Sequence, residues 1–376
     1  MDERMTPIDK RHADTEAFTE DLSMYEKRIL TESSEKRLIK RSRISDIVPV
    51  DSRTVTIKSA TDRTSKLLAP TMLLSGHDAA VYSVKIDPLG MHVASASFDQ
   101  QILLWNVHGD CCNYGVLLGH KNAILEVDWS YDSSKIASAS ADKTVALWDV
   151  ETQQRIKRWK DHKKVVNSCS LVPRGPSLLV SGSDDGTTKL WDARLKKRAV
   201  KTYDSSFQVT AVCFGKDSGQ IISGGLDGLV RCWDVRKDAV SMILRGHQDI
   251  ITGISLSPDG NHLLTNAMDS TLYRWDLRPY LPADQTSRCT MHFSGAKHGF
   301  ERNLIRCAWS HDARYVASGS ADRNAYIWDA ESGNLRYQLP GHTGSVNDVC
   351  FHPEEPIIAS CGSDKQIFLG ELSGFE

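Results

Sequence analysis

A tryptophan, in most copies followed by an aspartate, returns at nearly constant spacing, and this repetition restricts the possible folds more than any other feature. The steps between copies are 43, 43, 42, 42 and 53 residues, and the positions are Trp105, Trp148, Trp191, Trp233, Trp275 and Trp328. In the clearest copy, Asp142 follows His120 by 22 residues and precedes Trp148 by six. A fixed period of about 20 to 50 residues indicates repeated units that bury their apolar faces against one another.

A seventh copy begins at Gly341-His342, but Gly370 stands at its tryptophan position. The repeated unit resembles the WD40 repeat family, in which about 40 to 45 residues form one four-stranded blade. This resemblance implies an all-β fold, a seven-bladed WD40 β-propeller spanning residues 69–376. Alternation and turn residues predict the strands of blade two at about 124–129, 135–140, 144–149 and 155–159. The last copy provides only three strands, so we expect Thr71–Leu74 to complete blade seven and remove its open edge.

Residues 1–68 form a charged N-terminal extension without the repeat. It holds 14 basic and 13 acidic residues and no glycine. This composition predicts disorder or folding on a partner. Phe18, Leu22, Tyr25 and Ile29 share a helical face, which is typical either of a transient helix or of one that docks on a partner. The basic run Glu35–Arg43 is consistent with a nuclear-import signal or with a solvated helix face.

The totals restrict the class of protein. A net charge of −2 provides no global field for nucleic acid. The nine cysteines form no CxxC pair, which predicts reduced thiols in a cytosolic or nuclear protein without a metal site. The chain has no apolar run of ~20 residues and no secretory signal, so we expect a soluble, intracellular protein without membrane contact, cofactor or small-molecule substrate.

The resemblance to WD40 repeats also implies a buried hydrogen-bonded tetrad of His, Ser or Thr, Asp and Trp in each blade. Such a network suits a buried aspartate, which needs charge-assisted donors, and an indole N–H, which needs an acceptor. The expected members are His77, Ser95, Asp99, Trp105; His120, Ser138, Asp142, Trp148; His162, Ser181, Asp185, Trp191; Ser223, Asp227, Trp233; His247, Thr265, Asp269, Trp275; His298, Ser318, Asp322, Trp328; and His342, Ser360, Asp364.

Three blades depart from this pattern. Blade four has Tyr203-Asp204 in place of Gly-His, so Asp227 is expected to lack its histidine. Blade three lacks the glycine before His162, and blade seven lacks the tryptophan. We therefore predict incomplete networks in blades four and seven.

The recurrence of serine, histidine and aspartate also fits a hydrolase. A catalytic triad, however, occurs once and needs an exposed nucleophile beside an oxyanion site. These sets recur about seven times at scaffold positions, and no GxSxG, HExxH, Walker A or dinucleotide motif is found in the sequence. We therefore predict a protein that is not an enzyme and has no catalytic residues.

Two surfaces are candidate partner sites. We call the face that carries the Gly-His loops and the tetrad aspartates the histidine face. Phe98, Leu226 and Met268 precede aspartates there, and Val165, Phe207 and Ile250 follow histidine positions. An apolar sector over blades three to five (Val165, Phe207, Leu226, Ile250, Met268) is thus a predicted partner site; the alternative is that these side chains pack into their loops.

The opposite face carries three Trp-Asp-x-Arg motifs, which end at Arg194, Arg236 and Arg278. They resemble the box with which some WD40 substrate receptors dock the adaptor of cullin-type ubiquitin ligases; alternatively, each arginine pairs with a nearby carboxylate. Basic residues follow the outer strands of blades two and three, either to prevent edge pairing or to contact snRNA or pre-mRNA phosphates: Arg155, Lys157, Arg158, Lys160, Lys163, Lys164, Arg194, Lys196, Lys197 and Arg198. An insertion of about ten residues between Asp276 and His298 predicts an extended loop on blade five or six.

Residues 70–372 also carry segments outside the general repeat consensus, including ILLWNVHGDCCNY (102–114), TNAMDSTLYRWDLRP (265–279) and HGFERNLIR (298–306). With these segments the chain resembles the family of WD40 subunits of the spliceosomal U5 small nuclear ribonucleoprotein. The resemblance implies a nuclear, non-catalytic scaffold in pre-mRNA splicing that binds the large central protein Prp-eight and other U5 proteins. Two alternatives remain open: a substrate receptor of a cullin-type ubiquitin ligase, and a signalling β-subunit-like propeller with an N-terminal helix.

Overall fold

The computed structural model describes residues 65–175, 177–195, 198–216, 218–280 and 287–372. Within these residues, all regular structure is β-strand, arranged as seven antiparallel sheets of four strands. The predicted fold class, an all-β seven-bladed propeller, is confirmed. The helical face at Phe18–Ile29 and the basic run Glu35–Arg43 lie outside the described residues.

The strands follow the chain, four to a blade. Blades one to three comprise β2 (Val81–Ile86), β3 (His92–Ser97), β4 (Gln101–Asn106), β5 (Asn113–Leu118); β6 (Ile124–Trp129), β7 (Lys135–Ser140), β8 (Val145–Asp149), β9 (Arg155–Trp159); and β10 (Val166–Leu171), β11 (Leu178–Ser183), β12 (Thr187–Asp192), β13 (Lys201–Asp204). Blades four and five comprise β14 (Val209–Phe214), β15 (Gln220–Gly225), β16 (Val230–Asp234), β17 (Ala239–Leu244); and β18 (Ile251–Leu256), β19 (His262–Ala267), β20 (Thr271–Asp276), β21 (Cys289–Ser294). Blade six comprises β22 (Cys307–Trp309), β23 (Tyr315–Ser318), β24 (Ala325–Asp329) and β25 (Leu335–Leu339), and blade seven comprises β26 (Val346–Phe351), β27 (Ile357–Gly362), β28 (Gln366–Glu371) and β1 (Thr71–Ser75).

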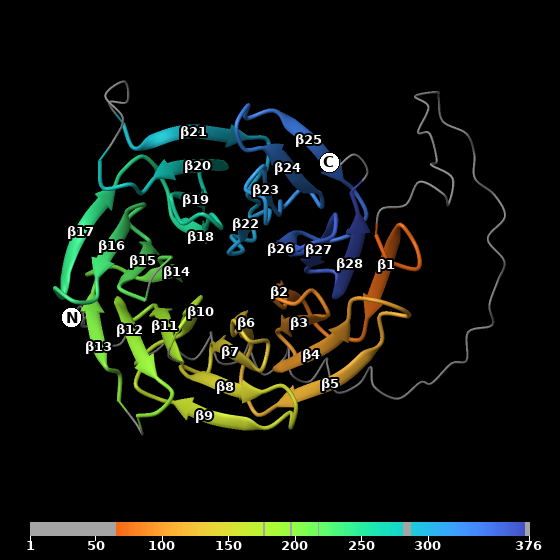
Figure 1. The fold of residues 1–376 in the computed structure, drawn as a ribbon, viewed down its shortest axis with the longest axis horizontal. Helices are drawn as coiled ribbons and strands as arrows, with labels where there is room; N and C mark the ends of the chain where they lie inside the picture. The colour runs from red at the N-terminus through yellow and green to blue at the C-terminus, as the bar shows by residue number, and fades with distance from the viewer. Residues whose placement is uncertain (1–64, 176, 196–197, 217, 281–286, 373–376) are drawn as a thin grey trace, which may run out of the picture. The chain divides into compact units, whose positions relative to one another are not determined.

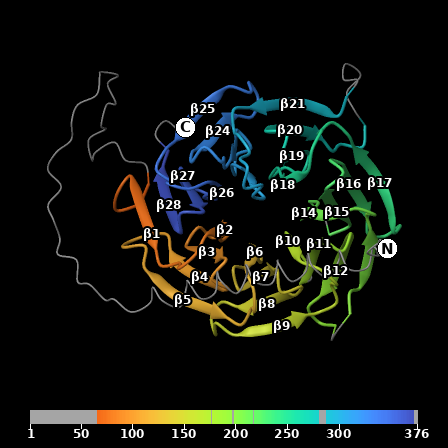
Figure 2. The same cartoon turned by 180° about the vertical axis from the view of Figure 1, so that it is seen from behind.

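The first strand of each blade lies nearest the ring axis (Figures 1 and 2). Each of these inner strands contacts the inner strand of the next blade, and β26 contacts β2, so the sequence of contacts closes on itself. The second and third strands are almost wholly buried, because a blade packs both of its faces against neighbouring blades. The core is therefore a circular series of clusters between blades, such as the one that joins Ala94 and Ile102 of blade one to Val127 and Trp148 of blade two.

The N-terminal strand closes the ring. Thr71–Ser75 pairs with β28 in the register Thr71↔Gly370 to Ser75↔Gln366, and gives blade seven its fourth strand. Leu74 is 3% exposed and belongs to the cluster between blades seven and one, whereas its neighbour Leu73 is 51% exposed. The long step between tryptophans is explained mainly by the loop between β20 and β21 of blade five, which runs from Leu277 to Arg288 and is described only in part.

We expect Leu74→Ala to lower the free energy of unfolding by about 2–5 kcal/mol, because it opens a cavity at the closure of the ring. Leu73→Ala is the matched control on the same strand and should cost less than about 0.5 kcal/mol, since its side chain is half exposed. Urea denaturation of both variants measures the difference. Equal losses would show that β1 does not close the ring through its buried face.

Candidate functional site on the ring axis and the histidine face

Four blades contain the complete tetrad. In blades one, two, three and five, histidine Nδ1 lies 2.7–3.1 Å from the aspartate, and Nε2 lies 2.6–2.8 Å from the Ser or Thr hydroxyl. The indole Nε1–H of the tryptophan donates to the same hydroxyl at 2.8–2.9 Å. Burial raises the pKa of Asp142, but hydrogen bonds from His120 and Thr144 outweigh it and hold the pKa well below its usual range. The ionised Asp142 therefore adds to the free energy of unfolding at pH values above the unfolded-state pKa of aspartate, about 4. This contribution is lost as the pH falls toward the lower pKa of the folded state.

Blades four and seven keep part of the network. In blade four Trp233 Nε1–H donates to Ser223 at 2.8 Å, and the Arg231 guanidinium, 2.6 Å from Asp227, takes the place of the missing histidine. The residue 22 positions before Asp227 is the buried Ser205, so Ser205 rather than Asp204 occupies the histidine position. In blade seven His342 lies 2.9 Å from Asp364 and 3.0 Å from Ser360, and its ring meets Phe368 edge-on at 4.6 Å.

The tetrad expected in blade six is wrong. His298 Nε2 lies 3.5 Å from Asn266 of blade five, and its backbone N–H donates to Ser270 at 3.2 Å. Trp328 Nε1–H donates to the Ser294 carbonyl at 3.2 Å instead of to Ser318. Asp322 accepts the Tyr326 hydroxyl at 2.5 Å. Burial lowers the pKa of His298 to about 4, so this imidazole is neutral at physiological pH.

Strand register explains the error. Gln101 pairs with Leu118, which is followed by Gly119 and His120; in the same way Thr271 pairs with Ser294, which is followed by Gly295 and Ala296. Gly295 has φ +122°, near the +143° of Gly119, a conformation that favours glycine. Ala296 thus occupies the histidine position of blade six, and His298 lies two residues beyond it in a longer loop.

The difference between the complete tetrad of blade two and the altered network of blade six provides an internal control for the stabilising effect of the tetrad. Ser138→Ala removes the hydroxyl that both His120 and Trp148 use, leaving two buried groups without a partner, and should cost about 2–4 kcal/mol. Ser318→Ala, at the equivalent and equally buried position of blade six, should cost less, because Asn266 Nδ2 also donates to the Ile305 carbonyl. Thermal unfolding of both variants tests this order; a larger loss for Ser318→Ala would contradict it.

A ring of β-bulges surrounds the axis. In six blades the inner strand skips one residue in its pairing: Tyr82, Leu125, Asn167, Thr210, Thr252 and Asn347. A bulge takes the extra residue out of the ladder, so its carbonyl needs another donor. In blade six the residue just before the inner strand is Arg306, and it is 3% exposed.

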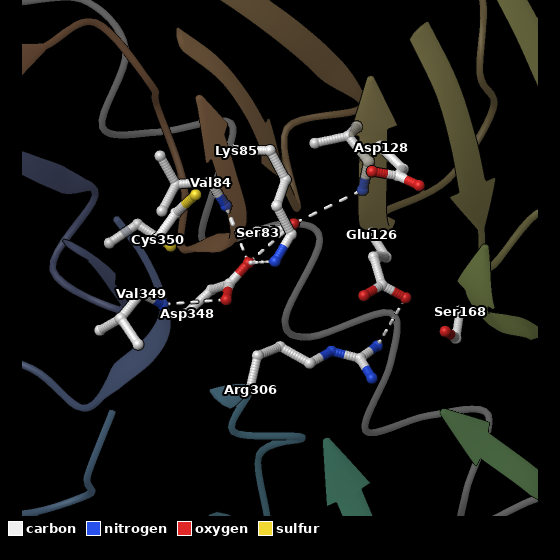
Figure 3. A network of polar contacts seen from close by, with 12 residues as sticks. Ser83, Val84, Lys85, Glu126, Asp128, Ser168, Arg306, Asp348, Val349 and Cys350 are labelled. Atoms are coloured by element: carbon white, nitrogen blue, oxygen red, sulfur yellow. Dashed lines mark hydrogen bonds and ion pairs between the residues drawn. The ribbon is translucent and has the colours of Figure 1, made fainter. Parts of the chain in front are cut away.

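Arg306 supplies donors to four of these carbonyls. Its Nη1 donates to Thr210 and Thr252 at 3.2 and 2.9 Å, and its Nη2 donates to Asn167 at 2.7 Å. Its backbone N–H donates to the Asn347 carbonyl at 2.8 Å. The guanidinium also lies 3.3 Å from the Glu126 carboxylate (Figure 3). One residue of blade six therefore joins blades two, three, four, five and seven, a role that the repeat spacing does not reveal.

The two members of the Arg306–Glu126 pair line different cavities. A cavity of about 180 Å³ at the histidine face is lined by Arg306, Tyr82 and the blade-six loop residues Arg302 to Leu304. A larger cavity of about 800 Å³ has Glu126 in its wall and reaches the first hairpin turns of the blades on the opposite face, at Tyr131, Arg174 and Lys216. Beside the pair, Lys85 Nζ lies 3.4 Å from Asp348, whose carboxylate also accepts Ser83 Oγ at 3.0 Å (Figure 3).

We expect Arg306→Met to lower the free energy of unfolding by about 3–5 kcal/mol, because it leaves Glu126 and three carbonyls without this donor. Adding Glu126→Gln should recover part of this loss, since it removes the unpaired charge. Arg302→Met, on the exposed part of the same loop, is the matched control and should change stability by less than about 0.5 kcal/mol. If the Arg306 and Arg302 variants unfold at the same urea concentration, the central role of Arg306 is wrong.

The predicted apolar sector lies at the histidine face, with unequal exposure. Phe207 is 51% and Leu226 40% exposed, while Val165, Ile250 and Met268 are half-buried. Leu226 N–H donates to the Gln208 carbonyl, as Met268 N–H donates to that of Ile250, so Gln208 rather than Phe207 is the equivalent of Ile250. Phe98 is exposed on blade one, away from this sector.

The sequence analysis did not select Phe300, the most exposed large apolar side chain of the described residues. It stands in the blade-six loop, where Arg302 N–H donates to the Gly299 carbonyl and Asn303 Nδ2 donates to Ser345 at 2.9 Å. Both loop ends are thus hydrogen-bonded while the ring of Phe300 faces solvent. In the sequence, the step of 53 residues from Trp275 to Trp328, about ten longer than the other steps, indicated that blades five and six differ from the others.

Several of the predicted basic residues on the opposite face and rim contact the protein itself. Arg194 and Arg278 fold back on Asp192 and Asp276, at 2.8 and 2.5 Å, whereas Arg236 forms no ion pair among the described residues. Arg158 lies 3.0 Å from Asp142, and Arg155 Nη1 donates to the Gly119 carbonyl at 3.0 Å. Lys196 and Lys197 lie outside the described residues.

All nine cysteines are free thiols. Among the described residues, no group of three His, Cys, Asp or Glu side chains is placed to hold a metal ion. The described part of the chain also contains no helix that is long and apolar enough to cross a membrane.

Seven four-stranded blades, closed by an N-terminal strand and with a complete His-Asp-Ser/Thr-Trp network inside four of them, define a WD-repeat propeller. The description "WD domain, G-beta repeat" matches seven segments, residues 68–106, 111–149, 153–192, 197–234, 239–276, 288–329 and 333–369. The chain therefore belongs to the WD-repeat family.

Curated relatives are similar over most of the chain. The U5 small nuclear ribonucleoprotein 40 kDa protein of Homo sapiens is 53% identical over 316 residues, which cover 84% of this chain and 87% of the relative. Its namesake in Dictyostelium discoideum is 48% identical over 83% of this chain and 87% of the relative. The pre-mRNA-splicing factor cwf17 of Schizosaccharomyces pombe is 44% identical over 89% of this chain and 96% of the relative. These similarities confirm the resemblance inferred from the sequence.

Proposed function

We propose that this protein is a non-catalytic scaffold of the spliceosome, a nuclear subunit of the U5 small nuclear ribonucleoprotein that acts in pre-mRNA splicing. The observation that carries the proposal is the similarity to splicing proteins, which covers 84% of this chain for the human relative and 89% for cwf17. A rigid ring suits this role, because its loops are held in fixed positions for partners. The serine and histidine side chains of the tetrads are buried within blades, which favours a structural role over catalysis.

We propose that the partner is the large U5 protein Prp-eight, as the resemblance implies, and that it binds the histidine face over blades four to six. Phe207 and Leu226 present exposed apolar surface there, and Phe300 adds an aromatic side chain on a hydrogen-bonded loop. His298 of this loop lies against blade five, which brings the loop beside Met268. Exposed aromatic residues surrounded by aliphatic ones are typical centres of protein interfaces.

A ubiquitin-ligase receptor is less well supported. Two of the three motif arginines, Arg194 and Arg278, are bidentate partners of their own aspartates, which fits an internal role. Of the three motif arginines, Arg236 is the one whose guanidinium forms no ion pair among the described residues. The signalling alternative depends on residues 1–64, which lie outside the described part of the chain. We also propose Arg198, which is exposed and forms no ion pair among the described residues, as a contact for snRNA or pre-mRNA phosphates.

Affinity purification of the tagged full-length chain from nuclear extract, followed by mass spectrometry, tests the proposal. We expect Prp-eight and other U5 proteins to be recovered. The double variant Phe207→Asp with Met268→Asp, and separately Phe300→Asp, should reduce this recovery at least tenfold with an unchanged melting temperature, since a charge in an interface centre costs several kcal/mol.

Leu335→Asp is the matched control, because Leu335 is similarly exposed but lies on the outer strand β25. It should leave recovery unchanged. Recovery of a cullin-ligase adaptor without splicing proteins would overturn the scaffold assignment. Recovery of splicing proteins with all three variants would keep that assignment and refute the proposed binding face.

A further inference from the structure

The deep end of the larger axial cavity, away from Arg174 and Lys216 at its rim, carries an unbalanced charge. Five ionisable side chains meet around the axis: Lys85 and Arg306 are cationic, and Glu126, Asp128 and Asp348 are anionic (Figure 3). Two of the carboxylates have ion pairs, Asp348 with Lys85 and Glu126 with Arg306. Asp128 forms none among the described residues, although the backbone N–H groups of Leu171 and Trp129 donate to it at 2.7 and 3.0 Å. With every group in its ordinary charged form, the axis holds one negative charge in excess.

Asp128 lines the cavity of about 800 Å³. Burial raises the pKa of Asp128 to about 6, outweighing the Leu171 N–H group and the more distant charge of Lys85. The other groups around it do not supply a free cation at depth. Burial raises the pKa of the thiols Cys169, Cys213 and Cys350, which are therefore neutral, and Lys85 is held in its charged form mainly by Asp348. Arg174, Lys216 and His311 stand at the rim, among the hairpin turns.

Large apolar side chains line part of the wall, beside the hydroxyl groups of Ser170, Ser255 and Ser257. Trp129, Phe214 and Leu256, from three different blades, line the passage from the turns to Asp128. This cavity is lined at the hairpin turns by Tyr131, Arg174 and Lys216, so we expect a ligand to enter from the turns. An entering group thus meets large apolar side chains and three charged ones, Lys85, Glu126 and Asp128, of which only Asp128 has no ion pair among the described residues. A cavity of this size is ample for a long side chain.

We propose that this cavity binds one cationic group on a flexible aliphatic shaft, with the Asp128 carboxylate as its counter-ion. The ammonium of a lysine side chain, the guanidinium of an arginine and the ammonium of a polyamine share this chemistry. The shaft lies against Trp129 and Phe214, and the cation balances the excess negative charge. This site is independent of the partner surface proposed on the histidine face.

Isothermal titration calorimetry of the full-length chain tests the site with four probes: the N-acetyl methylamides of lysine, arginine and norleucine, and spermidine. We expect the cationic probes to bind and the neutral norleucine probe to bind at least tenfold more weakly. Asp128→Asn should weaken the cationic probes at least tenfold. Asp312→Asn, on a hairpin turn of blade six and exposed, is the matched control and should leave binding unchanged.

The pH dependence gives a second readout. Because Asp128 must be ionised to bind a cation, wild-type affinity should fall about tenfold from pH 8 to pH 5, whereas the residual binding of Asp128→Asn should not change. Lys216→Glu, which reverses an exposed rim charge, should tighten binding several-fold, a gain that misfolding cannot produce.

Binding of lysine or arginine probes without spermidine would identify a partner's side chain as the ligand, and the reverse would identify a free polyamine. Binding of neither, equal binding of the norleucine probe, or full binding by Asp128→Asn would overturn the proposal. None of these outcomes bears on the splicing assignment. That assignment is tested separately, by the proteins that the affinity purification recovers.

Discussion

The hydrogen bonds of Arg306 at the axis are the interaction on which the ring most depends. Seven inner strands converge there. Six of them have a bulge, and each bulge leaves a carbonyl group that strand pairing does not satisfy. Bulge side chains satisfy part of this demand: Asn167 Nδ2 donates to Val209 at 3.0 Å, and Asn347 Nδ2 donates to Val81 at 2.7 Å. Arg306 serves carbonyls of blades three, four, five and seven together, and its guanidinium geometry permits several donors from one side chain.

Blade six exchanges one kind of stabilisation for another. The tetrads act within a blade, whereas Arg306 acts between blades. Blade six lacks the tetrad histidine, since Ala296 occupies that position, and its inner and second strands are only three and four residues long. Its longer loop, however, hydrogen-bonds to blades five and seven and leads directly into Arg306. The blade that lacks the tetrad histidine thus provides the one side chain, Arg306, that bonds to blades two, three, four and five.

Sequence spacing predicts those parts of the fold in which every partner lies at a fixed distance along the chain. The blade-two strands differ from their predicted bounds at one residue, Thr144, because turn residues and alternation are local signals. His120, Ser138, Asp142 and Trp148 meet for the same reason. Blade six fails, because its loop is longer: Ala296, at the histidine position, precedes Asp322 by 26 residues, whereas His120 precedes Asp142 by 22. Arg306 could not be found by spacing, since its partner Asn167 lies 139 residues away and offers only a backbone carbonyl.

The position of Arg306 also bears on how the two faces can act together. Arg306 lines the cavity at the histidine face, and its ion-pair partner Glu126 lines the larger cavity. This pair is thus a direct link between the two cavities, and its guanidinium is held by three carbonyls and does not move freely. A packed and hydrogen-bonded element with one arrangement transmits little, because coupling requires an element with two states. The two faces of the ring should therefore bind independently, so that the propeller acts as a rigid spacer between partners rather than as a switch.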